Sequence, residues 1–240
     1  MFLDYLKRGV VAGGVAGLAY GLFMATVANP LVGYLEHAQH GHSHGAESGS
    51  VVAESTTALV SVGGGLLWAV FLGGCFGIGL YILEPALPGR STARRFVLAA
   101  SGFLTISAVP WLVLPPFAPG AEQVLGTDTR FLLYGGLVGL GALVAASGVA
   151  AHNRLADRNR WLAIAGGVAP VVAAVVVLPA VAPPLVSHPE LSAELVTAYR
   201  AMVVLSQGSI WLVIAGTFGW LQRRSGVETA VSDPPQPNST

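Results

Sequence analysis

The residues best suited to chemistry are histidines packed into one short polar segment, YLEHAQHGHSHGAESGS at residues 34–50. The chain has six histidines, and this segment holds most of them: His37, His40, His42 and His44. Neutral imidazole is the commonest nitrogen ligand of divalent transition metals, and Glu36 and Glu47 add carboxylates. Such mixed ligands predict capture of a borderline ion such as Co²⁺, Ni²⁺ or Zn²⁺. The alternative is a solvated or pH-sensitive polar loop that binds no metal.

Few other polar side chains lie within or beside the long apolar stretches of the chain. Asn29 precedes Pro30 at the end of the first stretch, where it either begins an ion path and contributes to the metal site or caps a helix. Glu84 is either an exit ligand or an interfacial carboxylate beside a group of arginines. His188 is a further candidate for the outer site, and Gln207 either hydrogen-bonds a neighbouring helix or lines a path.

The composition places the chain in a membrane and argues against several classes of protein. Of its 240 residues, 53% are hydrophobic and only 10% are charged, whereas soluble domains carry about 25% charged residues. The net charge of zero gives no electrostatic footprint for nucleic acid. Lys7 is the only lysine, so the chain has no Walker A motif, and no H-E-x-x-H or G-x-S-x-G motif occurs. We therefore expect neither an enzyme nor a bound cofactor, apart from the transported or bound ion.

Six stretches approach the roughly 20 apolar residues that a membrane-spanning helix needs. They cover about 9–30, 57–83, 96–114, 131–151, 161–182 and 199–221. All basic residues except Arg130 and Arg200 fall on one side of these spans. By the positive-inside rule, both termini of this multi-pass protein of the cell membrane lie in the cytoplasm and the histidine loop lies outside. The predicted organisation is a leader at 1–8, a membrane domain at 9–222 with an outer loop at 34–56, and a disordered cytoplasmic tail at 223–240.

The spans carry two regularities that predict how they pack. A glycine stripe with a spacing of four residues marks the first span, and shorter versions occur in the second and fourth: Gly9, Gly13, Gly17 and Gly21, Gly73 and Gly77, Gly135 and Gly139. Such stripes let helix backbones approach closely. Odd-numbered spans end near proline and even-numbered spans are rich in small residues, which predicts three pseudo-repeated helix pairs in a threefold bundle. The likeness is strongest between the second and third pairs.

The opening segment, YLKRGVVAGGVAGLAYGLFMATVANPLVGYLEHAQHGHSHG, resembles the start of CbtA-type predicted cobalt transporter proteins. The shared features are a basic leader, a glycine-rich first span, an Asn-Pro exit and an acidic, histidine-rich loop. LEPALPG at 83–89 and the proline-rich ends of the third and fifth spans also look like that family. The resemblance implies a cobalt uptake subunit linked to cobalamin supply, with a small single-span CbtB-like partner. It also implies one span fewer than the hydropathy predicts.

Two hypotheses of different classes follow. In the first, the chain is a transporter subunit for a divalent metal, with the histidine loop gathering the ion and Asn29 passing it inward. In the second, it is a non-transporting scaffold or metal sensor that binds a partner through its glycine faces. The number of histidines does not select cobalt, because nitrogen and oxygen sites generally bind Ni²⁺ and Cu²⁺ more tightly than Co²⁺. The choice of cobalt comes from the resemblance.

Overall fold

The computed structural model describes residues 1–39, 51–118, 121–183, 185–187 and 191–232. Within these residues, six helical stretches are long and apolar enough to cross a membrane. They are Phe2–Tyr34, Val62–Leu83, Ser91–Val113, Thr127–Ala156, Arg160–Val181 and Ala193–Ser225. Each overlaps one stretch predicted from hydropathy, which confirms the all-α membrane fold with six spans.

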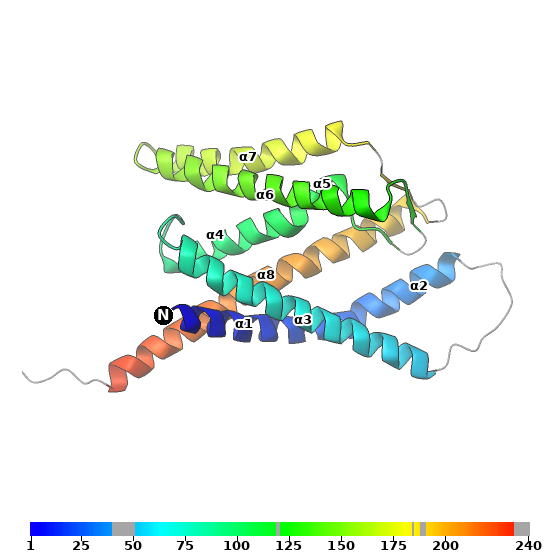
Figure 1. The fold of residues 1–240 in the computed structure, drawn as a ribbon, viewed down its shortest axis with the longest axis horizontal. Helices are drawn as coiled ribbons and strands as arrows, with labels where there is room; N and C mark the ends of the chain where they lie inside the picture. Colours follow the sequence, from blue (N-terminus) through cyan, green and yellow to red (C-terminus); the bar gives the residue numbers. More distant parts are fainter. Residues whose placement is uncertain (40–50, 119–120, 184, 188–190, 233–240) are drawn as a thin grey trace, which may run out of the picture.

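Figure 1 labels the elements in chain order. The first span joins α1 (Phe2–Phe23), the π-helical turn η1 (Met24–Ala28) and α2 (Asn29–Gln39), and the third joins α4 (Ser91–Phe103), the π-helical turn η2 (Leu104–Ala108) and α5 (Val109–Val113). The other spans are α3 (Val51–Leu83), α6 (Thr127–Ala156), α7 (Arg160–Val181) and α8 (Ala193–Ser232). Two short strands, β1 (Glu122–Gln123) and β2 (Val186–Ser187), pair antiparallel and tie together two connections at one end of the bundle.

The last helix is longer than the last candidate span. α8 continues to Ser232, whereas the stretch long and apolar enough to cross a membrane ends at Ser225. Each added helical residue gains a backbone hydrogen bond, and the first proline that would stop the helix is Pro234. Residues 233–240 lie outside the described residues.

The glycine stripe of the first span is where two helix backbones meet. All four of its glycines are buried: Gly9, Gly13, Gly17 and Gly21. A Cβ atom on Gly13 would contact the carbonyl oxygen of Ala69 and lie 2.8 Å from the Cα atom of Val70, both backbone atoms of α3. Gly73 and Gly77 of α3 face α1 in the same way. The predicted close packing of the first two spans is confirmed.

The matching prediction for the fourth span is not met within the described residues. Gly135 and Gly139 face open space. The tight contacts of α6 fall instead at Gly141, where a Cβ would lie 2.8 Å from the Cα atom of Thr105 in η2, and at Gly148, which faces α7. A spacing of four residues reveals a stripe but does not reveal whether a neighbouring helix covers it.

The spans form a row instead of the predicted threefold bundle (Figure 1). α3 packs on α1, α1 on α8 and α8 on α4, while α6 packs on η2 and α7 packs on α6. The reason lies in the large side chains of α8. Trp211, Ile214 and Phe218 are buried in the centre of the core, whereas the buried residues of α7 are the small Ala163 and Ala174. The third pair therefore separates, with α8 central and α7 at the edge.

The first and third spans share a backbone irregularity that the sequence prediction missed. In both, a π-helical turn ends two residues before a proline, in MATVANP at 24–30 and LTISAVP at 104–110. Proline has no N–H group for the carbonyl four residues earlier, and the preceding N–H bonds five residues back, from Asn29 to the Met24 carbonyl and from Val109 to the Leu104 carbonyl. Because of this shared irregularity, the first pair of spans resembles the second pair.

The carbonyl that Pro110 leaves without its helical donor has a partner on another span. The Tyr134 hydroxyl on α6 donates a 2.7 Å hydrogen bond to the Ile106 carbonyl oxygen. We expect Tyr134→Phe to lower the free energy of unfolding by about 0.5–1.5 kcal/mol, because the carbonyl loses this donor. Thermal unfolding in detergent measures the change. Tyr81→Phe removes a hydroxyl from an exposed ring on α3 and is the control; an equal effect of both changes would contradict the prediction.

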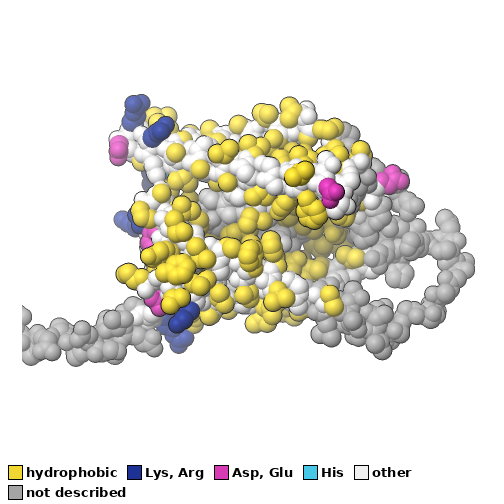
Figure 2. All heavy atoms as spheres, viewed as in Figure 1, with side chains coloured by type: hydrophobic (Ala, Val, Ile, Leu, Met, Phe, Trp, Pro, Cys, Tyr) yellow, Lys and Arg dark blue, Asp and Glu magenta, His cyan; other side chains and the backbone are white. Residues whose placement is uncertain are grey.

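Most of the charge lies at the two ends of the molecule. The Lys and Arg side chains visible in Figure 2 gather at the left end, where α1 begins, α3 turns into α4 and α6 turns into α7. We call this the basic end. Arg130 and Arg200 belong instead to the opposite end, at the beginnings of α6 and α8. This separation matches the pattern predicted from the sequence.

Candidate metal-entry site

The first span remains one helical unit well beyond its proline. After η1, α2 continues through Pro30 to Gln39, which places Asn29 at the junction of the π turn and the outer helix. The side chain of Asn29 is half-buried, and no hydrogen-bond partner of its amide lies among the described residues. In membrane transporters, interrupted helices mark the places where backbone carbonyls face a substrate path. Asn29 therefore lies at a suitable point for a polar group to meet an ion.

The structure separates the predicted ligands along this helix. Glu36 and His37 lie on α2, seven and eight residues beyond Asn29, which corresponds to a rise of about 10–12 Å. The backbone positions of Asn29 and of the Glu36–His37 pair therefore lie about two turns apart along one helix.

The remaining predicted ligands of the outer site lie beyond what can be described. His40, His42 and His44, and the candidate His188, lie outside the described residues. Among the residues described, no group of three or more His, Cys, Asp or Glu side chains is close enough to hold a metal ion. The histidine cluster remains a prediction.

A cavity beside the second half of α1 is lined by polar residues that the sequence reasoning did not select. It lies between α1 and α8 and has a volume of about 530 Å³. Its walls are mostly apolar but include Tyr20, Met202, Ser206 and Ser209. The last three lie on one face of α8 at spacings of four and three residues, a pattern that is readable in the sequence. The neighbouring amide, Gln207, is half-buried on the same helix.

At the basic end, Glu84 is held by its neighbours. The Tyr5 hydroxyl donates a 2.8 Å hydrogen bond to its Oε2 atom, and Arg94 Nη1 lies 3.9 Å from its Oε1 atom. These contacts join the beginning of α1, the end of α3 and the beginning of α4. The interfacial interpretation of Glu84 therefore fits the structure better than an exit ligand, which would need free carboxylate oxygens.

Arg95 is the most deeply buried charged residue in the described part of the chain, with a relative exposure of 4%. Its Nη1 atom donates to Gln222 Oε1 at 2.7 Å and its Nη2 atom donates to Thr92 Oγ1 at 3.0 Å. The guanidinium also packs against Gly219 of α8. The Arg95 side chain therefore links α8, the central helix, to the beginning of α4.

We expect Arg95→Ala to lower the free energy of unfolding by about 1.5–3 kcal/mol, because hydrogen bonds to a charged group are lost. Thermal unfolding of the purified protein in detergent measures the change. Arg90→Ala is the matched control, since Arg90 is exposed in the same turn and makes no side-chain cap to α4. Equal stabilities of the two variants would contradict the structural role of Arg95.

Comparison with protein families agrees with this architecture. The family model described as a probable cobalt transporter subunit, CbtA, matches residues 2–223. The chain is a member of the CbtA family. No curated protein and no solved structure matches the chain. The CbtA match covers all six candidate spans nearly to their ends, so the family and the helices together indicate a multi-pass membrane protein of a cobalt transport system.

Proposed function

We propose that this CbtA protein carries Co²⁺ across the cell membrane and captures the ion with its histidine-rich loop. The observation that carries the proposal is the continuation of the first span through Pro30 into α2. That helix brings Glu36 and His37 well beyond Asn29 and leads directly into the segment that contains His40, His42 and His44. In this proposal, an ion gathered by the imidazoles passes along α2 to the Asn29 amide.

The proposed orientation follows from the distribution of charge. The basic end faces the cytoplasm, and both termini with it, because cytoplasmic connections of membrane proteins are enriched in Lys and Arg. The histidine loop then faces the outside, where it meets the substrate. Inward movement of a dication gains about 2.3 kcal/mol per charge for each 100 mV of membrane potential, so transport does not require ATP hydrolysis by this chain.

The proposed path runs from Asn29 along η1 to the cavity between α1 and α8. Thr26 in η1 donates from Oγ1 to the Leu22 carbonyl at 2.8 Å, and Pro30 cannot donate to the Thr26 carbonyl. Deeper in the membrane, Met202, Ser206 and Ser209 line the cavity. The two serine hydroxyls donate to carbonyls of their own helix, and their oxygen atoms can still accept a contact from an ion. These groups offer weak, successive contacts, which suit passage better than retention.

We expect Asn29→Ala to lower the maximal rate of Co²⁺ uptake while the concentration for half-maximal uptake changes little. The reason is that Asn29 acts after capture, about 10–12 Å along the helix from the Glu36–His37 pair. Initial rates measured over a range of Co²⁺ concentrations separate the two quantities. A change confined to the half-maximal concentration would place Asn29 in the capture site instead.

The test of the function is uptake of radioactive Co²⁺ by cells that express the protein, with and without a small CbtB-like single-span partner. Uptake above that of empty cells, competed by excess unlabelled Co²⁺ more effectively than by Ni²⁺ or Zn²⁺, supports the proposal. Restored growth of a strain that depends on imported cobalt for cobalamin would support the link to cobalamin supply. Uptake equal to empty cells, with the protein and its partner inserted, would reject transport and favour the scaffold.

A further inference from the structure

A second cavity lies at the end of the bundle that is opposite to the basic end. It has a volume of about 560 Å³ and lies between the end of α5, the beginning of α6, the β2 connection and α8. Its walls are largely apolar and include several aromatic rings: Trp111, Phe117, Phe131, Tyr134 and Tyr199. The volume lies within the range of small-molecule sites, which is about 300–1,000 Å³. This cavity is separate from the cavity between α1 and α8 that belongs to the proposed metal path.

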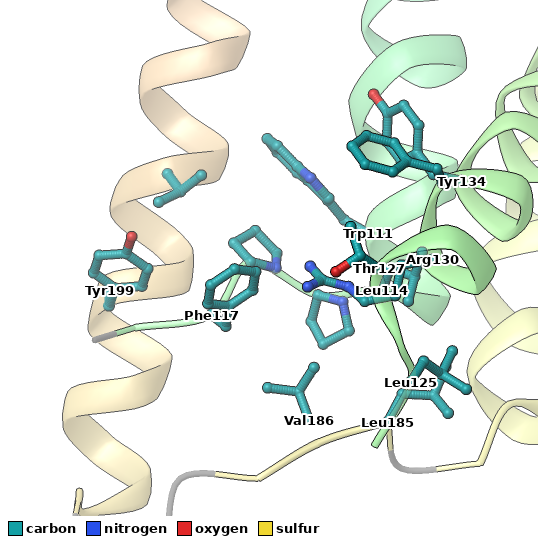
Figure 3. A pocket seen from close by; sticks show the side chains of 14 residues that line it. Trp111, Leu114, Phe117, Leu125, Thr127, Arg130, Tyr134, Leu185, Val186 and Tyr199 are labelled. Atoms are coloured by element: carbon teal, nitrogen blue, oxygen red, sulfur yellow. The ribbon is translucent and has the colours of Figure 1, made fainter. Parts of the chain in front are cut away.

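The charged residue in the wall of this cavity is Arg130. Figure 3 shows its guanidinium extending into the space between Phe117 and Trp111, with the Thr127 hydroxyl nearby. The guanidinium carbon lies 5.1 Å from the centre of the Phe117 ring. This stacking orients the guanidinium, whose planar group of N–H donors is the charged feature of a largely apolar cavity wall.

The combination selects a ligand with one anionic group and one apolar part. A guanidinium repels a metal dication and instead binds phosphate or carboxylate through paired N–H donors. The aromatic rings around it are typical of the level at which membrane lipids change from hydrocarbon to headgroup.

We propose that this outer cavity binds one phospholipid, with its phosphate against Arg130 and Thr127 and an acyl chain along Trp111 and Val203. Phosphate is also present as a free ion in solution, but the apolar walls favour the lipid over the ion. The bound lipid fills the space between α6 and α8, which pack on opposite sides of the third span. This proposal is independent of Co²⁺ transport.

Two substitutions test the phosphate contact and the acyl-chain contact separately. Arg130→Gln removes the charge, and Val203→Phe fills the cavity from α8 without changing charge. We expect each change to lower the amount of phospholipid that co-purifies with the protein by about 10-fold or more. Arg130→Gln removes hydrogen bonds to a charged group, and Val203→Phe excludes the acyl chain. Mass spectrometry of the detergent-purified protein measures the ratio of lipid to protein. Arg158→Gln removes an exposed charge at the basic end and is the control.

A second measurement keeps the test decisive where a variant folds poorly. Thermal unfolding of the delipidated wild-type protein is followed with added phosphatidylglycerol, phosphatidylcholine or inorganic phosphate. Stabilisation by phospholipid that is absent in Val203→Phe supports the proposal. Stabilisation by inorganic phosphate equal to that by lipid would replace the lipid site with a simple anion site. A lipid ratio that is unchanged in both Arg130→Gln and Val203→Phe would overturn the proposal.

Discussion

Replacing Gly13 with alanine is expected to disrupt the contact between the first two spans. The added Cβ would contact the Ala69 carbonyl and lie 2.8 Å from the Val70 Cα atom. Both are backbone atoms of a long helix, so they cannot turn aside as a flexible side chain could. Overpacking of this kind costs about 1–3 kcal/mol, and we expect a loss toward the upper end of that range. The midpoint of thermal unfolding and the yield of monodisperse protein in detergent measure it.

The neighbouring glycine provides the control. A Cβ on Gly14 would meet nothing within 4 Å, and alanine has a higher helix propensity than glycine by about 1 kcal/mol in soluble hosts. Gly14→Ala should therefore leave the protein as stable as the wild type or slightly more stable. Equal losses from Gly13→Ala and Gly14→Ala would show that the stripe does not form the helix contact described above.

Changing His37, His40, His42 and His44 together to alanine is expected to produce the largest effect on transport. Even the indirect partners of metal-bound histidines contribute about 10–100-fold to metal affinity. Loss of the imidazoles themselves should raise the Co²⁺ concentration for half-maximal uptake by at least that factor. The maximal rate should change less, because Asn29 and the cavity between α1 and α8 remain. Concentration series of radioactive Co²⁺ uptake separate these two quantities.

A matched variant in the same segment distinguishes metal capture from a general effect of altering the loop. Changing Ser43, Ser48 and Ser50 to alanine removes polar groups and leaves every histidine in place. This variant should transport Co²⁺ like the wild type. If the four-histidine variant also does so, with equal amounts inserted in the membrane, the loop is a solvated connection and the ion enters elsewhere.

The features that follow from hydropathy and charge were predictable from the sequence. Apolar stretches of sufficient length can only be helices in lipid, because every backbone polar group must be satisfied within the segment. The six spans, the separation of basic residues and the close packing of Gly13 followed from such local rules. The family resemblance of the opening segment was confirmed by the match to the family model.

The arrangement of the spans depended on information that no local pattern contains. Whether Gly141 or Gly139 meets a neighbour is decided by the facing helix, and in this protein η2 lies against Gly141. The central place of α8 depends on how Trp211 and Phe218 fill the space between the first and third spans. The π turns, by contrast, could have been predicted, because the Ala-x-Pro endings that MATVANP and LTISAVP share are readable in the sequence. The candidate ligands in the histidine loop stay a prediction.

The position of α7 at the edge of the row has a consequence for how the family diverges. Most of its side chains face away from the rest of the protein, among them Val172, Val175 and Val176. Selection on such positions preserves hydrophobicity and little else, so they can exchange among apolar residues from one lineage to another. Gly13 and Gly73, where two backbones touch, tolerate no such exchange. An alignment of CbtA sequences should therefore show rapid drift along α7 and near-invariance along the contact between α1 and α3.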